Sequence, residues 1–196
     1  MCLRISKPRE LWIDAGSGTG NLSSELIAAG LRVVDIDHDI GMTRYAKEKF
    51  ELAGVVAKTQ KLPFRDQIAD GLVAISLIGC LPELPPFLAE VNRVLKPKAN
   101  AILTFTNRSS HLHRVNRLFR KSTEFFRAYS ISEIKNELEN AGLEIKHLRF
   151  CNFVIEGKRR IFPSNGISKR FENLVPRFIS SQIARNVVVV SQKIHP

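Results

Sequence analysis

The sequence predicts an α/β fold built on a doubly wound, mostly parallel sheet, and three observations lead to it. Short β-branched or apolar runs alternate along the chain with segments of helical periodicity, the pattern of a parallel sheet covered by helices. An apolar run near residue 11 ends in a glycine-rich turn, after which a helical pattern opens. The composition, with 44% hydrophobic and 25% charged residues over 196 positions, is that of a globular chain with a full-sized core.

Seven strands and four long helices are expected, each bounded by turn residues. The last helix has the clearest limits, because Ser130 and Ser132 precede its first turn and Gly142 follows its end as a C-cap. The run Asn186–Val190 is apolar on both faces, which favours a central strand. The strands are expected near residues 10–15, 31–37, 54–58, 71–79, 101–106, 144–151 and 185–192, and the helices near 21–29, 40–52, 84–95 and 131–141.

The glycine-rich turn reads Gly16-Ser-Gly18-Thr-Gly20 and follows a strand that ends at Asp14 and Ala15. Glycines allow a tight turn, close approach of main chain to a ligand and close packing of the next helix, whose first N–H groups can hold an anion. The spacing departs from the dinucleotide fingerprint G-x-G-x-x-G. An acid at Asp14 suits a cationic group such as the ammonium of an amino acid. Taken alone, the turn could also be purely structural.

In these residues the chain resembles the class I methyltransferases that use S-adenosylmethionine, whose first motif reads D-x-G-x-G-x-G. Asp37, with Met42 five residues later, matches the family's second motif, and Leu62-Pro-Phe64 matches the turn after its third strand. Residues 69–78 resemble the fourth strand, and residues 90–97, Glu-Val-Asn-Arg-Val-Leu-Lys-Pro, the helix end before the fifth. The resemblance covers about residues 10–106. It implies the strand order 3-2-1-4-5-7-6, with the seventh strand antiparallel, and a single domain over residues 1–196.

The resemblance also implies the cofactor, S-adenosylmethionine, which leaves as S-adenosylhomocysteine, and the residues that hold it. Asp37 stands about 20 residues after the glycine turn, as expected for an acid that binds ribose hydroxyls, and Asp35 is the weaker candidate for that role. His38 is expected near the adenine. The expected cofactor-binding residues are Asp14, Gly16, Ser17, Gly18, Gly20, Asp37, His38, Thr59 and Ser76.

Two features of the chain depart from the family pattern: one residue, Lys58, and the short segment before the first strand. Lys58 stands where an acid often contacts the adenine amino group, four residues before Leu62, and an ammonium group cannot accept a hydrogen bond. Adenine recognition would then depend on main chain, Thr59 or Gln60. Only about nine residues precede the first strand, so the site is expected to be covered by residues 107–129, by a partner chain or dimer, or to be open.

The acceptor side is less defined, and no catalytic residue is assigned. His111, His113 and Tyr129 are candidate bases, although a surface or packing role explains each of them better. Leu77, Ile78 and Phe87 could form an apolar wall or belong to the core. The chain lacks the D/N-P-P-Y/F signature of nucleobase N-methylation, a Pro-Cys nucleophile and a cysteine cluster. These absences disfavour several kinds of nucleic-acid methylation and the methylation of arsenic. The expected reaction is methyl transfer to an oxygen, nitrogen or carbon of a small molecule, such as a quinone, sterol, phospholipid or sugar.

The charge is uneven along the chain. Residues 1–100 hold 13 basic and 12 acidic residues, whereas residues 101–196 hold 17 and 7. The basic half contains two expected insertions, 107–130 and 156–181, in which cationic residues alternate with apolar or aromatic ones. Such a surface could attract a phosphorylated or lipid-like acceptor, an anionic lipid surface or RNA, or could simply be solvated. An RNA methyltransferase and a non-catalytic binding subunit are therefore the alternative functions.

Other features favour a cytoplasmic protein, with a membrane-peripheral one as the alternative. The longest uncharged apolar run, Leu72–Leu81, is too short to span a bilayer. The N-terminal residues lack the pattern of a signal peptide. Cys2, Cys80 and Cys151 are scattered without metal-ligand spacing, which indicates structural cysteines in a reducing compartment and no metal site.

Overall fold

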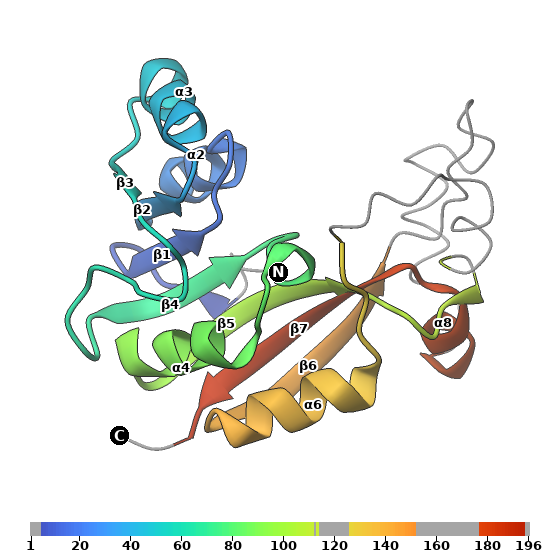
Figure 1. Ribbon diagram of the computed structural model, residues 1–196. Coiled ribbons are helices and arrows are strands. Elements are labelled where there is room, and N and C mark those ends of the chain that lie inside the picture. Colours follow the sequence, from blue (N-terminus) through green and yellow to red (C-terminus); the bar gives the residue numbers. More distant parts are fainter. Residues whose placement is uncertain (1–4, 112, 114–125, 152–176, 195–196) are drawn as a thin grey trace, which may run out of the picture.

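The computed structural model describes residues 5–111, 113, 126–151 and 177–194 (Figure 1). Its seven strands form one sheet in the order β3-β2-β1-β4-β5-β7-β6, which confirms the predicted order. β7 runs antiparallel to both β5 and β6, and the other neighbours are parallel. The strands are β1 (Leu11–Ala15), β2 (Arg32–Asp37), β3 (Gly54–Val56), β4 (Ala69–Ala74), β5 (Leu95–Thr106), β6 (Leu143–Cys151) and β7 (Asn186–Lys193).

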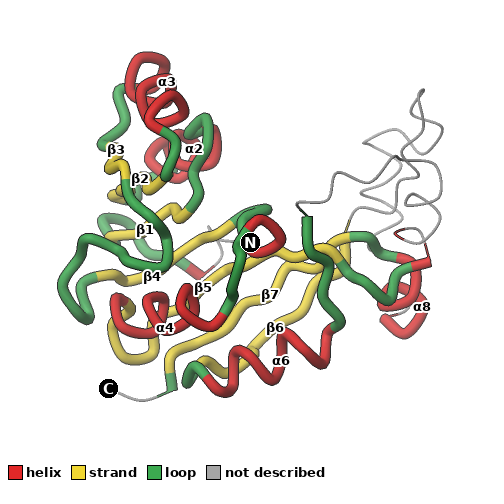
Figure 2. Tube along the Cα trace, viewed as in Figure 1, coloured by secondary structure: helices red, strands yellow, loops and turns green. Residues whose placement is uncertain are grey.

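Helices cover the sheet in two groups, which Figure 2 shows in red. α2 (Asn21–Ala28) and α3 (Ile40–Phe50) lie at the β1–β3 end, whereas α4 (Pro85–Val94) and α6 (Ile131–Asn140) lie along the other strands (Figure 1). α8 (Arg177–Ile183) precedes β7, and a 3₁₀ turn, η1 (Ile78–Cys80), follows β4. One core cluster includes Phe87 of α4 and Ile134 of α6, and a second forms around Trp12 with Leu26 of α2.

Local sequence explains where the helices begin. At α6, the Ser130 hydroxyl accepts from the Glu133 N–H at 3.2 Å and the Glu133 carboxylate accepts from the Ser130 N–H at 2.7 Å, a capping box. At α3, the Asp39 carboxylate accepts from the N–H groups of Gly41 and Met42. These two predicted helices therefore begin where their capping residues indicate.

Three elements differ from the prediction. β4 ends at Ala74 and not at 79, because Ser76 adopts a left-handed φ of 59° and the chain enters η1. The turn is buried, with Ile78 fully inaccessible, so its apolar residues read as a continued strand. β5 begins at Leu95 and not at 101, where it pairs with Ala69 before an irregularity in register. α8 was not predicted.

The two expected insertions fall largely outside the described residues. Of residues 107–130, the structure describes 107–111, 113 and 126–130, and of 156–181 it describes 177–181. The apolar stripe with flanking cations, residues 112–125, and the basic clusters at 158–160 and 169–170 lie outside the described residues.

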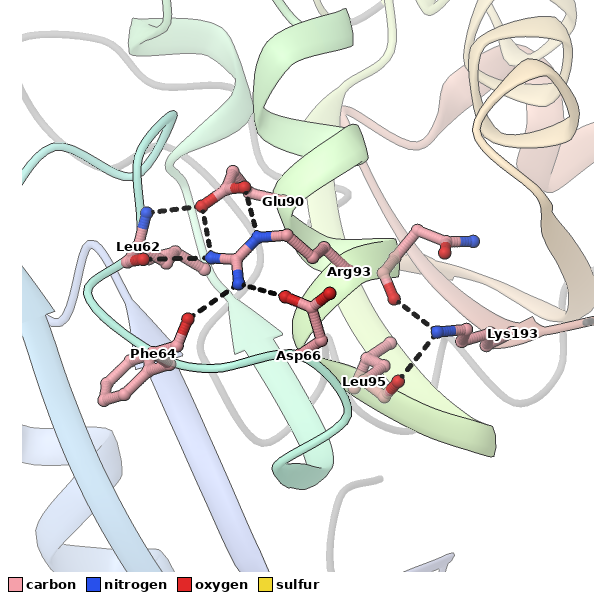
Figure 3. Close-up of polar contacts among 8 residues, drawn as sticks. Leu62, Phe64, Asp66, Glu90, Arg93, Leu95 and Lys193 are labelled. Atoms are coloured by element: carbon pink, nitrogen blue, oxygen red, sulfur yellow. Dashed lines mark hydrogen bonds and ion pairs between the residues drawn. The ribbon is translucent and has the colours of Figure 1, made fainter. Parts of the chain in front are cut away.

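An arginine of α4 fixes the loop between β3 and β4, on which Thr59 lies (Figure 3). The Arg93 guanidinium donates to both Glu90 carboxylate oxygens, at 2.7 and 2.8 Å, to Asp66 at 2.7 Å and to the carbonyls of Leu62 and Phe64 at 3.0 and 2.7 Å. Glu90 also accepts from the Leu62 N–H at 2.6 Å. The pKa of Glu90 is lowered, mainly by the hydrogen bond from Arg93. Helix and loop therefore form one hydrogen-bonded unit.

Replacing Arg93 by Met is expected to lower the free energy of unfolding by about 2–3 kcal/mol, because it leaves a partly buried carboxylate and two carbonyls without their donor. Urea unfolding measures this. Lys96→Met is the matched control, since Lys96 pairs with Asp70 at a more exposed position and is expected to cost under about 1 kcal/mol. Equal losses for the two variants would contradict the role given to Arg93.

Candidate active site

The glycine turn lies where the strand order reverses. β1 has β2 on one side and β4 on the other, and ligands of open α/β sheets bind at the carboxyl ends of strands beside such a switch point. Gly16, Gly18 and Gly20 have φ values of 73°, 54° and 74°, a backbone conformation that glycine adopts without strain. The turn therefore requires these residues for conformational reasons, before any ligand is considered.

Main-chain hydrogen bonds attach this turn to the end of β2. The N–H groups of Gly16 and Ser17 donate to the Ile36 carbonyl, at 2.7 and 3.1 Å, and the Gly18 N–H donates to the Asp37 carboxylate at 2.8 Å. The sequence predicted close approach of this turn's main chain to a ligand. In the structure, these three N–H groups hold the turn against β2.

Space for a ligand opens at Gly18. A Cβ atom built on Gly18 would meet no atom within 4 Å, whereas one on Gly16 would lie 2.8 Å from Leu77 Cδ1 and one on Gly20 2.5 Å from Leu52 Cδ1. The Ser17 hydroxyl oxygen is buried and has no hydrogen-bond partner among the described residues. Main chain at Gly18 and an unsatisfied hydroxyl beside it therefore offer a ligand both room and a polar contact.

Asp37 lies at the carboxyl end of β2, next to this opening. Its side chain is nearly buried, and its two oxygens accept from the N–H groups of Gly18, at 2.8 Å, and Asp39, at 2.9 Å. Each carboxylate oxygen can accept a second bond, so Asp37 has the capacity to take two hydroxyl groups. His38 is 81% exposed, with its Nδ1 atom 3.4 Å from Asp37.

Asp14 lies deeper, at the end of β1. It is 2% exposed, and its Oδ2 atom accepts from the Ser23 hydroxyl of α2 at 2.8 Å. Burial raises the pKa of Asp14 to about 7, and the nearby charges of Asp35 and Asp37 add to the rise. The sequence did not single out Ser23, because nothing in the local pattern shows which α2 side chain turns towards the sheet.

The two remaining expected residues come from the ends of β3 and β4. Thr59 is buried in the loop after β3, and the Ala57 N–H of that loop donates to the Asp37 carbonyl at 3.0 Å. Lys58, beside it, is exposed. Ser76 is also exposed, and its N–H donates to the Thr104 hydroxyl at 2.7 Å. The expected cofactor residues thus come from the ends of four neighbouring strands.

Of the candidate acceptor residues, Tyr129 lies beside Asn107 and Arg108, in the segment that leads to His111. Tyr129 is buried, its ring 4.9 Å from the Arg127 guanidinium, and its N–H donates to the Thr106 carbonyl. His111 and His113 follow Ser110, whose hydroxyl donates to the Ile183 carbonyl of α8. Ile78 and Phe87 are fully buried in the core and so form no wall, whereas Leu77 packs against Gly16.

One residue beside the site was not predicted. Phe126 is 44% exposed and lies against Gly79 of η1, where a Cβ atom would come 2.7 Å from its ring. The Arg127 N–H donates to the Gly79 carbonyl at 2.8 Å, which holds this segment at the end of β4. Its position depends on a contact between residues far apart in sequence, which no local pattern reveals.

The described residues contain neither a candidate metal site nor a helix that could span a membrane. No three His, Cys, Asp or Glu side chains in the described part of the chain gather in a way that could hold a metal ion. Among the same residues, no helix combines the length and the apolar character needed to cross a membrane.

The residues described above fit S-adenosylmethionine. The opening at Gly18 leaves room for main-chain contact, the Ser17 hydroxyl has an unmet hydrogen bond, and Asp37 has free capacity for ribose hydroxyls. Asp14 is an acid that a cationic ammonium group could pair with. The geometry of these residues therefore suits the cofactor that the sequence motifs suggested.

Comparison with known proteins agrees with this. A family model described as a methyltransferase domain matches residues 13–103. Over 108 residues the chain is 31% identical to the ubiquinone/menaquinone biosynthesis C-methyltransferase of Bartonella bacilliformis, a match that covers 48% of this chain and 41% of that protein.

Solved structures show the same fold. A methyltransferase of Thermotoga maritima, described as a possible histamine N-methyltransferase, superposes with a TM-score of 0.72 at 18% identity, covering 98% of this chain and 86% of that one. A complex of a Haloferax volcanii methyltransferase with the Trm112 methyltransferase activator gives 0.71 at 17% identity, covering 99% and 88%.

The chain spans less than half the length of the curated relatives that it matches. The family model covers the strands that build the glycine turn, Asp37 and the end of β4. The matching model identifies residues 13–103 as a methyltransferase domain, and the strand order and the five sequence motifs are those of the class I methyltransferases, whose cofactor is S-adenosylmethionine.

Proposed function

We propose that this chain transfers the methyl group of S-adenosylmethionine to an oxygen, nitrogen or carbon atom of a small-molecule acceptor. The observation that carries the proposal is the uncrowded main chain at Gly18, whose N–H donates to the Asp37 carboxylate and which follows Ser17 with its buried, unpartnered hydroxyl. No other element of the described structure combines these features with a sheet switch point.

Different residues would bind different parts of the cofactor. Asp14 would pair with the ammonium group, Gly16, Ser17, Gly18 and Gly20 would form the main-chain floor, and Asp37 would accept from the ribose hydroxyls. His38 and Thr59 lie at the adenine end, and Ser76 lies at the end of β4. When bound, the cofactor supplies a methyl group already activated on a sulfonium. The protein has mainly to align acceptor and methyl group and to exclude water.

The acceptor would occupy the β4 side of the switch point, since the cofactor residues take the β1–β3 side. Exposed apolar side chains lie there, Ile75 at 38% and Phe126 at 44%, together with the exposed Cys80, Ser76 and Arg127. An acceptor with an apolar or aromatic portion suits such a surface. The net positive charge of residues 101–196 would favour one that also carries a phosphate or other anionic group.

Asp37→Asn is expected to weaken binding of S-adenosylmethionine about 10- to 100-fold, because hydrogen bonds to a charged acceptor contribute about 1.5–3 kcal/mol. Isothermal titration calorimetry measures this. Asp39→Asn is the control: it removes a carboxylate charge two residues away and retains an oxygen for capping α3. Equal affinities for wild type and Asp37→Asn would show that another residue binds the ribose.

Binding measurements with RNA and with S-adenosylmethionine separate the alternative functions. If RNA is the acceptor, RNA will bind with a steep salt dependence, as the basic half of the chain would favour. If the chain is a non-catalytic subunit, or needs a partner chain as the Haloferax volcanii relative has in its complex, the isolated chain will not bind the cofactor at high micromolar concentration.

A further inference from the structure

Two carboxyl groups lie side by side beneath the glycine turn. Asp14 of β1 pairs in register with Asp35 of β2, so that both side chains extend from the same face of the sheet. Each residue is 2% exposed. Asp14 is proposed above to meet the cofactor's ammonium group, whereas Asp35 has no part in the proposed cofactor contacts. A second buried acid at this place therefore needs a physical explanation.

Asp35 accepts no hydrogen bond of good geometry from a described residue, although the Ser23 hydroxyl lies near it. Neither of its carboxylate oxygens is paired among the described residues, because the single proton of the Ser23 hydroxyl is donated to Asp14. Its Oδ2 atom lies 3.3 Å from the position that a Cβ atom on Gly20 would occupy, in the same packed region as Ala46 and Leu52. An ionised carboxylate without partners in such surroundings is costly.

The charged groups that act on this pair are all acidic. Within the described part of the chain, Asp35 and Asp37 are the charges that affect Asp14, and Asp37 is the one that affects Asp35. Burial raises the pKa of Asp35, the nearby Ser23 hydroxyl opposes the rise, and the charge of Asp37 adds to it. The elements packed around the pair contribute uncharged groups: Val73 of β4, Gly54 of β3, Ser23 of α2 and Ala46 of α3.

We propose that Asp35 is a positioning residue for the cofactor: it keeps one proton on the Asp14–Asp35 pair in the cofactor-free protein, and the cofactor's ammonium group displaces that proton to solvent on binding. One O–H bond breaks, the proton passes to the buffer, and the ammonium keeps its own protons. The inference rests on the proposed function, since it requires a cofactor that carries an ammonium group.

The expected consequence is a pH-dependent affinity that Asp35 controls. The pKa of Asp14 is about 7 in the cofactor-free protein, so wild-type affinity should fall towards tenfold per pH unit as the pH drops below 7. Asp35→Asn removes one negative charge beside Asp14, and the fall in affinity should then begin at a lower pH. A residue with a merely structural role would change affinity by the same factor at every pH.

Calorimetry between pH 5.5 and 7.5, in two buffers of different ionisation enthalpy, counts the protons released on binding. We expect close to one proton per S-adenosylmethionine for the wild type at pH 6, and clearly less for Asp35→Asn. Asp39→Asn, which removes an exposed carboxylate from the same turn, should match the wild type. Binding of 5′-methylthioadenosine, which lacks the ammonium group, should release no proton from any variant.

The outcomes separate this inference from the proposed function. Equal proton release by wild type and Asp35→Asn would overturn the role of Asp35, even though both bind the cofactor. Failure of the wild type to bind either ligand would instead overturn the proposed function, and with it the premise of the inference. If Asp35→Asn does not fold, Asp35→Val suits the apolar surroundings and should show the same shift.

Discussion

Gly20→Ala is expected to lower the free energy of unfolding by about 2–4 kcal/mol, from a left-handed backbone that costs alanine about 1–2 kcal/mol and from overpacking of similar size. Gly20 has a φ of 74°. An added methyl group would lie 2.5 Å from Leu52 Cδ1 and 2.9 Å from Ala46 Cβ. The N-terminus of α2 would have to move away from α3. Urea unfolding of the cofactor-free chain measures the loss.

Gly18→Ala is the matched control, because it differs mainly in its surroundings. The residue is also left-handed, with a φ of 54°, but the added methyl group would meet no atom within 4 Å. Only the backbone strain of about 1–2 kcal/mol should appear. If this free space is where the cofactor binds, Gly18→Ala should nevertheless lose cofactor affinity strongly. Equal destabilisation by the two variants would contradict the packing assigned to Gly20.

Asp14→Asn is expected to stabilise the cofactor-free protein at pH 8 by up to about 4 kcal/mol while it abolishes tight cofactor binding. Burial and the charges of Asp35 and Asp37 raise the pKa of Asp14 from 3.8 to about 7 in the folded protein. Between these values the folded protein binds the proton more tightly than the unfolded chain does. Wild-type stability therefore falls as the pH rises through this window, relative to Asp14→Asn.

Unfolding free energies at pH 4.5 and pH 8 test this, and the difference between the two proteins should grow with pH. Asp70→Asn is a control with the opposite sign. Although burial opposes it, hydrogen bonds from Lys96 and the Leu11 N–H lower the pKa of Asp70, so its ionised form stabilises the fold above about pH 4. That variant should lose stability at neutral pH. A gain for Asp14→Asn that does not depend on pH would contradict the buried charge.

Much of the fold could be predicted because local pattern and burial agree in this chain. β7 has valines on both faces, as a strand between two others requires, and it lies between β5 and β6. The predicted end of β4 was wrong, because the 3₁₀ turn η1 that follows it is also apolar and has Ile78 buried. Hydrophobicity reports burial, and it does not distinguish a strand from a buried turn.

The residues of the candidate site were likewise predictable only in part. Asp14, the glycines and Asp37 were predicted to form it because each follows a strand at a set spacing, and parallel strands bring such positions to one edge. Ser23 and Phe126 were missed, because the orientation of a helix and the path of a distant segment bring them close. The direction in which the N–H groups of the glycine turn point was also not predictable, since it depends on the main chain of β2.

The position of β7 has a consequence for the order in which the protein assembles during synthesis. β6 pairs with β7 alone, and β5 needs β7 on one side, yet β7 follows both of them in the sequence. Until β7 emerges from the ribosome, two strand edges remain unpaired and open to association with other chains. The buried Lys193 ammonium, which donates to the carbonyls of Asn92 and Leu95 at 2.9 and 3.0 Å, then joins the end of β7 to the start of β5 (Figure 3). The edges of β5 and β6 that face each other are therefore covered only once β7 is in place.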